Sequence, residues 1–227
     1  MATPHTTSWP LIQAAAAGSR PEREEFVRRY VPAVREYLGA RWRRTRLEQE
    51  IEDAVQEVFL ECFRSGGVLA KADPERPGGF RAFFYGVLRN VAARHEQRAG
   101  RQLDTAATTP SELDRAPGAV ESASTLFDRA WARAILKEAA ARQEQRARTA
   151  GDSAWRRFQI LRLRFQEGLP IREIARLWQQ DAAFLHHEYA AARKEFEAAL
   201  REVVAEREPG SAADQDRILR ELIDTLE

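Results

Sequence analysis

The sequence is poor in cysteine, in long apolar runs and in residues that favour strands. Its single cysteine, Cys62, excludes an internal disulfide framework. No apolar run approaches the roughly 20 residues that a membrane-spanning helix needs, and the first residues lack the basic-then-apolar order of a signal peptide. We therefore expect a soluble, cytoplasmic protein that does not enter a membrane.

The residues that are abundant favour helices. Ala, Glu, Arg, Leu and Gln dominate, and all of them are good helix formers. Runs of Val, Ile and Thr are absent, so we expect an all-α fold of two helical domains joined by a flexible linker, followed by a short C-terminal helix. The predicted parts are a first domain (8–98), the linker (99–124), a second domain (125–207) and a second linker with an acidic helix (208–227). The acidic helix is expected either to pack on this chain or a partner, or to fray.

The net charge of +1 hides a segregation of charge along the chain. Residues 47–62 contain no Lys or Arg, and their acids are Glu48, Glu50, Glu52, Asp53, Glu57 and Glu61. Residues 80–101 contain one acid, Glu96, and their arginines are Arg81, Arg89, Arg94, Arg98 and Arg101. Segregated charge suggests two different partner surfaces. Either block alone also suits an ordinary solvated helix face.

The stretch IEDAVQEVFLECFR, residues 51–64, shows two stripes at helical spacing. The apolar stripe, which we expect to face the core, is Ile51, Val55, Val58, Phe59 and Cys62. The second stripe is Asp53, Gln56, Glu57 and Leu60. A leucine framed by carboxylates and an amide suits the docking of a basic, helical partner, so this second stripe is a candidate docking stripe. A solvated face is the alternative that periodicity alone favours.

The stretch FRAFFYGVLRNVAARHEQR, residues 80–98, combines an apolar face with a basic one. The polar candidates are Arg81, Tyr85, Arg89, Asn90, Arg94 and Arg98. Guanidinium groups suit phosphates, asparagine can hydrogen-bond a base, and exposed aromatic rings can stack on unpaired bases. These residues therefore form a candidate nucleic-acid surface, with an ordinary solvated helix as the alternative.

DAVQEVFLECFR, a Gly-rich loop and FRAFFYGVLRNVAARHEQR together resemble domain 2 of the extracytoplasmic-function (ECF) sigma factors, which belong to the sigma-70 family. The residues that match its pattern are Asp53, Gln56, Glu57, Phe80, Arg81, Arg89 and Asn90, while Phe83 stands at the usual tryptophan. ILRLRFQEGLPIREIARLW, residues 160–178, is similar to the start of the family's domain 4. The resemblance covers roughly residues 22–98 and 125–200.

The resemblance implies a transcription initiation factor, with neither enzymatic activity nor a cofactor. Asp53, Gln56, Glu57 and Leu60 would dock on the clamp coiled coil of the β′ subunit of core RNA polymerase, and the β flap would be a second contact. Residues 66–79 would accept a flipped base of the promoter −10 element, and the basic residues after them would hold the strand. Promoter DNA is thus an expected partner, and an anti-sigma factor is a further candidate.

Residues 169–196 have the spacing of a helix-turn-helix. The side chains expected to build its small core are Ile174, Ala175, Trp178, Leu185 and Tyr189. Asp181 is a suitable N-cap for the second helix. We therefore expect this part of the chain to keep the helix-turn-helix shape.

The second helix of this motif departs from the family. The family usually has glycine where Gln179 stands and cations at positions 186 and 188, which are His186 and Glu188 here. A carboxylate near the groove would be repelled by phosphate, so we expect an atypical recognition helix with weak DNA affinity. Its candidate −35 contacts are His186, His187, Arg193 and Lys194. The adjacent histidines lack the i, i+4 spacing of helical zinc ligands, so no metal site is predicted.

Two other functions remain open at this stage. A polymerase-binding adaptor or anti-initiation protein would keep the docking stripe but select no promoter. A helix-turn-helix regulator that never meets polymerase would not need residues 51–64. The docking stripe argues against the regulator, and only the second helix of the helix-turn-helix favours the adaptor.

Overall fold

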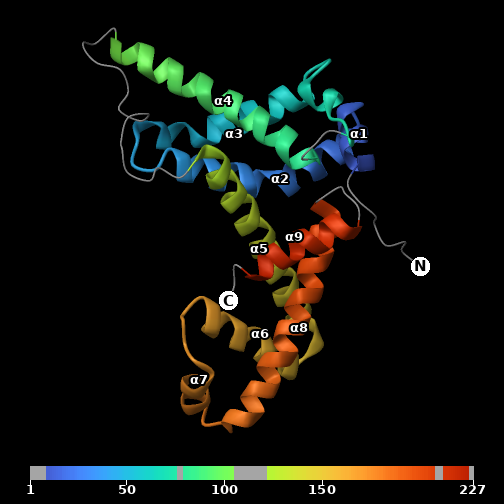
Figure 1. The fold of residues 1–227 in the computed structure, drawn as a ribbon, viewed down its shortest axis with the longest axis vertical. Coiled ribbons are helices and arrows are strands. Elements are labelled where there is room, and N and C mark those ends of the chain that lie inside the picture. Colours follow the sequence, from blue (N-terminus) through green and yellow to red (C-terminus); the bar gives the residue numbers. More distant parts are fainter. Residues whose placement is uncertain (1–8, 76–78, 105–121, 208–211, 225–227) are drawn as a thin grey trace. The chain divides into compact units, whose positions relative to one another are not determined.

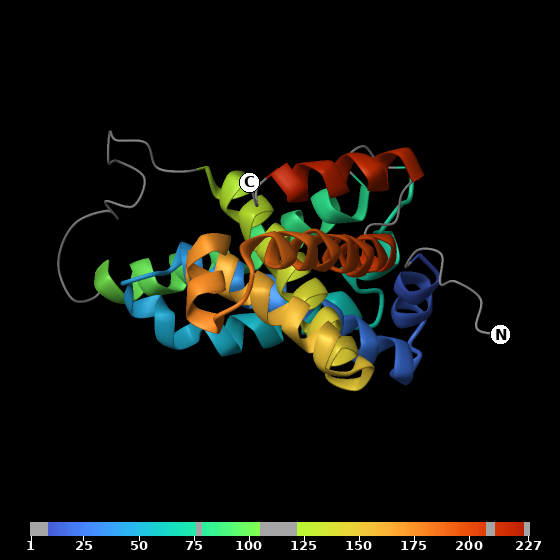
Figure 2. The same ribbon diagram turned by 90° about the horizontal axis from the view of Figure 1, so that it is seen from below.

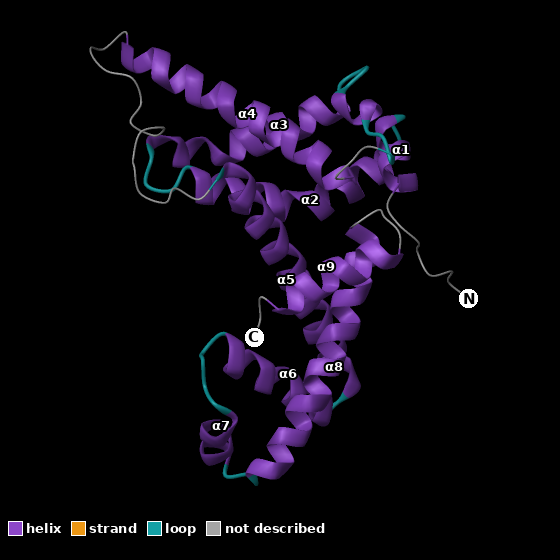
Figure 3. Cartoon of the chain, in the orientation of Figure 1, coloured by secondary structure: helices purple, strands orange, loops and turns teal. Residues whose placement is uncertain are grey.

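The computed structural model describes residues 9–75, 79–104, 122–207 and 212–224. Within these residues every regular element is a helix (Figures 1 and 3), which confirms the predicted all-α class. None of the described helices is both long enough and apolar enough to cross a bilayer. The chain divides into two compact units, unit 1 (Met1–Ala134 with Arg207–Gly210) and unit 2 (Ile135–Glu206 with Ser211–Glu227).

Unit 1 is built from α-helices and two short 3-10 helices. In chain order its elements are α1 (Trp9–Ala16), α2 (Arg20–Arg41), η1 (Arg46–Glu50), α3 (Ile51–Phe63), η2 (Val68–Lys71), α4 (Gly79–Asp104) and the start of α5 (Ala123–Ala150), up to Ala134. The buried side chains of α2 recur at helical spacing, namely Phe26, Tyr30, Val34 and Leu38, together with the capping Trp42. Helical periodicity therefore marks the inner face of α2.

Aromatic side chains fill the centre of unit 1. The ring of Tyr30 stacks on that of Trp131, with centroids 5.6 Å apart. Phe84 packs edge-on against Trp131 at 6.3 Å and against Phe26 at 6.0 Å. Such pairs add specific aromatic contacts to the burial of large apolar surfaces. Because Trp131 lies on α5, the start of this helix is part of the unit 1 core.

The division between the units lies within α5, whereas the sequence places it between residues 124 and 125. Phe127 and Trp131 are almost fully buried in unit 1. The predicted linker begins at residue 99, but α4 continues as helix to Asp104, and residues 105–121 lie outside the described residues. The packing of these two aromatic residues in unit 1 depends on residues far away in the sequence. Local composition contains no information on such contacts, so the sequence could not show this boundary.

Unit 2 holds the rest of α5 and the helix-turn-helix. Its further elements are α6 (Asp152–Phe165), α7 (Ile171–Trp178), α8 (Ala182–Arg207, to Glu206 in this unit) and α9 (Ala212–Asp224). Helices α6 and α8 lie side by side (Figures 1 and 2), and Arg157 Nε of α6 donates to Glu195 Oε1 of α8 at 2.6 Å. The predicted tail helix is present as α9, and Asp216 accepts a hydrogen bond from Arg201 of α8 at 3.0 Å. The tail thus packs on its own chain.

Candidate functional site

Helix α3 has the two faces that the sequence predicts. Its buried side chains include Val55, Val58, Phe59 and Cys62. On the other face Asp53 and Gln56 are exposed, and Leu60 keeps 69% of its surface accessible. A leucine this exposed, with polar neighbours one turn away, is available to a partner.

The remaining residue of the docking stripe, Glu57, contacts three side chains of α4. Its Oε1 accepts from Arg94 Nε at 3.0 Å, and its Oε2 lies 2.8 Å from His95 Nε2 and 3.3 Å from Arg98 Nη1. Arg94 also donates to Glu61 at 3.1 Å. Burial alone would raise the pKa of Glu57, but the donors from α4 outweigh it and lower the pKa.

A histidine that the sequence analysis did not single out completes this arrangement. His95 is 5% exposed, packs against the ring of Trp42 at 5.6 Å, and places Nδ1 2.8 Å from Glu50 Oε2. Both ring nitrogens of His95 therefore lie within hydrogen-bonding distance of a carboxylate, one from Glu50 and one from Glu57. The available signal was its position four residues after Val91, on the buried stripe of α4. Together these contacts form the Glu57 cluster, which consists of Glu50, Glu57, Glu61, Arg94, His95 and Arg98.

Two other candidates on α4 are covered by the start of α5. Arg81 Nε donates to Asp128 Oδ1 at 3.0 Å. The ring of Tyr85 lies 5.1 Å from that of Phe127 and is half-buried. Tyr85 was expected to be exposed for stacking on bases. It is not, because α5 packs on this side of α4.

Arg89 and Asn90 are the candidates that remain open to solvent. Both are exposed, and neither makes a side-chain hydrogen bond or ion pair with the part of the chain that the structure describes. A guanidinium and an amide with unused donors can bind a phosphate and a base edge, respectively. Their geometry therefore fits the predicted nucleic-acid surface without rearrangement.

The loop between α3 and α4 is anchored at its first turn. A Cβ at Gly67 would lie 2.6 Å from the carbonyl oxygen of Cys62, so only glycine fits there. Leu69 of η2 is buried, and Asp73 accepts a hydrogen bond from the backbone of Glu75 at 2.9 Å. The predicted base-accepting segment, residues 66–79, includes residues 76–78, which lie outside the described residues.

The helix-turn-helix of unit 2 has a defined turn. Gln179 adopts the left-handed conformation (φ 53°, ψ 42°), and Gln180 N–H donates to Ala175 O at 2.9 Å. The predicted N-cap is confirmed, since Asp181 Oδ1 accepts from Phe184 N–H at 2.9 Å. Of the predicted core residues, Ile174, Ala175 and Leu185 are buried, and Trp178 and Tyr189 are partly buried. They pack together with Ile160, Leu163 and Ile171.

The structure corrects the role expected for Glu188. Its side chain is only 7% exposed and faces Arg157 of α6, with Nη1 3.9 Å from Oε2. Glu188 follows Leu185 by three residues and precedes Ala192 by four, so it lies on the buried face of α8. It therefore does not meet a groove-bound phosphate. The candidate −35 contacts, by contrast, are all exposed: His186, His187, Arg193 and Lys194.

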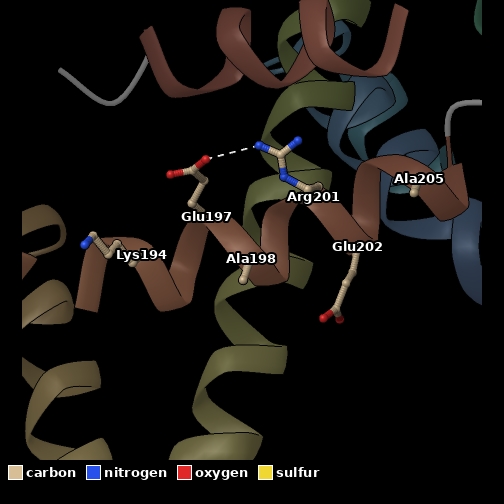
Figure 4. Close-up of a pocket in the computed structure, with 6 residues that line it drawn as sticks. All are labelled: Lys194, Glu197, Ala198, Arg201, Glu202 and Ala205. Carbon is tan, nitrogen blue, oxygen red and sulfur yellow. Dashed lines mark hydrogen bonds and ion pairs between the residues drawn. The ribbon is translucent and has the colours of Figure 1, made fainter. Parts of the chain in front are cut away.

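Surface grooves also occur in the described part of unit 2. The groove on α8 (Figure 4) is lined by Lys194, Glu197, Ala198, Arg201, Glu202 and Ala205. Its charges are largely satisfied within the chain, because Arg201 donates to Glu197 at 3.2 Å and Arg146 pairs with Glu202. The other groove, of about 360 Å³, lies among α5, α6 and α8, and its apolar lining includes Leu136, Phe158, Leu161, Phe165 and Phe196. Among the described residues, no group of three His, Cys, Asp or Glu side chains is placed to hold a metal ion.

Part of the chain is similar to a known protein family. Residues 26–102 match the family model of sigma-70 region 2, a span that runs from within α2 through α3 and most of α4. The match therefore includes the docking stripe, the Glu57 cluster and the open Arg89 and Asn90. No match was found among the curated proteins. The match thus makes this part of the chain similar to region 2 of the sigma-70 family.

Proposed function

We propose that the protein is an ECF-type sigma factor that binds core RNA polymerase and directs promoter recognition and DNA melting. The observation that carries the proposal is the region 2 match over the very helices that present the docking stripe and the basic face. The order of the two motifs along the chain, with a helix-turn-helix after them, supports the ECF type.

Docking on polymerase is assigned to the exposed face of α3. Asp53, Gln56 and Leu60 are open to solvent, and Glu57 lies between them on the same face. A basic, helical partner such as the β′ clamp coiled coil would offer cations to the carboxylates and apolar surface to the leucine. The β flap would need an apolar binding surface, and the groove of unit 2 that includes Phe165 is the candidate.

Promoter contact is assigned first to Arg89 and Asn90, which need no release from other side chains. Arg94 and Arg98 would add phosphate contacts if they leave Glu57. Arg81 and Tyr85 would join them only if the start of α5 moves away. Residues 66–79 remain the proposed acceptor of a flipped base, and the exposed face of α8 remains the proposed −35 contact.

The test of docking measures the affinity of the full chain for core polymerase. Asp53→Lys should weaken it at least about tenfold, because reversing a charge in a complementary patch costs a few kcal/mol. Leu60→Ala should weaken it about tenfold, because it removes apolar surface that the partner would bury. Glu52→Lys is the matched control, since Glu52 is on the same helix but is turned to α2, where it pairs with Arg35 at 2.6 Å. Equal affinities for wild type and both docking variants would refute the assignment.

A polymerase-binding adaptor or anti-initiation protein is the second candidate. The observation that favours it is that the start of α5 contacts Arg81 and Tyr85, two of the predicted DNA contacts, through Asp128 and Phe127. Run-off transcription with core polymerase on a library of promoters separates the two functions. Transcripts from a defined promoter motif establish the sigma factor, whereas tight core binding without initiation establishes the adaptor.

A further inference from the structure

The groove among α5, α6 and α8 has the lining of a small-molecule site. Apolar side chains from all three helices line it, namely Leu136 of α5, Phe158, Leu161 and Phe165 of α6, and Phe196 of α8. Its volume of about 360 Å³ lies in the range of such sites, about 300–1,000 Å³, which are mostly apolar with a few polar groups. All of these residues belong to unit 2, so the groove is complete within one compact unit.

Two polar side chains of the lining are unused. Arg162 and Gln166 are exposed, lie one helical turn apart, and make no side-chain hydrogen bond or ion pair with the described part of the chain. Other polar groups of the lining are occupied, since Gln143 donates to a backbone carbonyl of α8 at 3.2 Å and Glu144 accepts from Arg148 at 2.6 Å. A guanidinium and an amide at the same end of α6 are therefore available to a ligand.

The charge around the groove favours an anion. Its lining contains two cations, Arg162 and Lys137, and one carboxylate, that of Glu144, which Arg148 already neutralises. Lys137 takes part in an interaction within the chain, so Arg162 is the cation that a ligand can bind. The fork of a guanidinium matches the two oxygens of a carboxylate, and the amide of Gln166 can donate a further hydrogen bond.

The end of α6 does not exclude an anion. The last carbonyls of a helix carry partial negative charge, which repels a carboxylate. Here two of them are capped, because Arg162 O accepts from Gln166 N–H at 2.8 Å and Leu163 O accepts from Leu169 N–H at 3.1 Å, with Gly168 at φ of 70°. Since these carbonyls are satisfied, the full positive charge of Arg162 outweighs what remains of the helix dipole.

We propose that this groove binds a small amphipathic carboxylate, with its apolar part along the phenylalanines and its carboxylate on Arg162 and Gln166. The ligand buries apolar surface that water otherwise covers, since Phe165 is 44% exposed. An uncharged apolar ligand would leave the guanidinium without a partner, and a purely polar one would leave the aromatic lining in contact with water. If the proposed function holds, a bound ligand would also exclude the β flap, for which the same groove is the candidate surface.

The experiment titrates the full chain with phenylbutyrate by isothermal titration calorimetry, and with phenylbutyramide as an uncharged ligand of the same shape. Phenylbutyrate should bind wild type with a Kd of about 1 mM or tighter, as expected for a ligand of this size. It should bind about five- to tenfold more tightly than phenylbutyramide, because hydrogen bonds to a charged group are stronger than neutral ones. Equal affinities for the two ligands, or no saturable binding of phenylbutyrate, would overturn the proposal.

Replacing Arg162 with alanine identifies the charged contact. Arg162→Ala should weaken the binding of phenylbutyrate about five- to tenfold and leave that of phenylbutyramide nearly unchanged, so the preference for the carboxylate disappears. Arg164→Ala is the matched control, because Arg164 is an exposed arginine of the same helix that lies outside the lining of the groove. Equal losses in the two variants would show a general charge effect and overturn the proposal.

Replacing Phe165 with alanine tests the apolar contact. Phe165→Ala should weaken both ligands by the same factor, about three- to fivefold, and keep the preference for the carboxylate. Unchanged affinities for both ligands would place them outside the groove and overturn the proposal. If Phe165→Ala fails to fold by circular dichroism, Ala141→Phe takes its place, since it adds volume at an exposed residue of the lining and should also weaken both ligands.

The outcome is separable from that of the proposed function, because ligand binding is measured without polymerase. Wild type that binds core polymerase but not phenylbutyrate would refute the ligand site and leave the sigma-factor role intact. Wild type that binds phenylbutyrate with the expected preference but does not bind core polymerase would refute the sigma-factor role and support the ligand site.

Discussion

Replacing Gln179 with glycine should stabilise the helix-turn-helix. Gln179 follows α7 in the left-handed conformation, with φ of 53° and ψ of 42°. Its N–H donates to Arg176 O at 3.2 Å and that of Gln180 donates to Ala175 O at 2.9 Å, the bonding pattern of a Schellman cap. Left-handed backbone costs a residue with a Cβ about 1–2 kcal/mol, and glycine avoids this cost.

The net gain is smaller than this cost. Glycine has more freedom in the unfolded chain, which takes back about 0.5–1 kcal/mol. We therefore expect Gln179→Gly to stabilise the turn by about 0.5–1 kcal/mol. Gln179 is exposed and makes no side-chain hydrogen bond in the described structure, so removal of its side chain adds no further loss.

Hydrogen–deuterium exchange of the full chain measures this change where it acts. Amides of α7 and the start of α8 should exchange roughly two- to fivefold more slowly in Gln179→Gly. Gln180→Gly is the matched control, since Gln180 is the neighbouring exposed glutamine and does not have positive φ. It should exchange faster than wild type. Slower exchange in both variants, or no change at Gln179→Gly, would refute the conformational explanation.

Three further predictions concern unit 1. Trp131→Ala should destabilise it by about 3–5 kcal/mol, seen as faster exchange in α2 and α4, because the ring is buried against Tyr30; wild-type exchange there would show that α5 is not part of this core. Burial, and then the charge of Glu61, raise the pKa of the Cys62 thiol to about 12, so iodoacetamide should label it only after unfolding. Burial would raise the pKa of Glu96, but hydrogen bonds that include those from Arg41 lower it. The stabilising effect of Glu96 is thus complete above the ordinary carboxyl pKa and is lost as pH falls through the lowered one. In urea unfolding measured at a series of pH values, Glu96→Gln should therefore reduce the loss of unfolding free energy at acidic pH. The same loss in Glu96→Gln and wild type would contradict this.

The sequence predicted those features of the fold that depend on one helix at a time. The apolar stripes of α2 and α3 recur at helical spacing, and the structure buries them. Exposure of Leu60 and the cap at Asp181 were also predictable, because each depends on residues a few positions away. Periodicity assigns faces to a helix, and a face that is apolar is nearly always the buried one.

What the sequence did not show depends on how helices are rotated against each other. The spacing of Arg94 and Arg98 suggested a free basic stripe, but it could not show that α4 turns them toward Glu57 of α3. The cover over Tyr85 likewise depends on Phe127, more than forty residues along the chain. Contacts of this kind are set by the packing of whole helices, which no local pattern contains.

The burial of Glu188 removes the reason for expecting weak DNA affinity from the second helix of the helix-turn-helix. Repulsion of phosphate requires an exposed carboxylate, and Glu188 instead faces Arg157 within unit 2. Glu195 is also engaged by Arg157, at 2.6 Å. The first acid of α8 that the structure leaves exposed is therefore Glu197, which lies beyond the exposed Lys194 and pairs with Arg201. Since only exposed side chains reach a groove, α8 presents His186 and His187 and then Arg193 and Lys194 to it before any exposed acid of this helix.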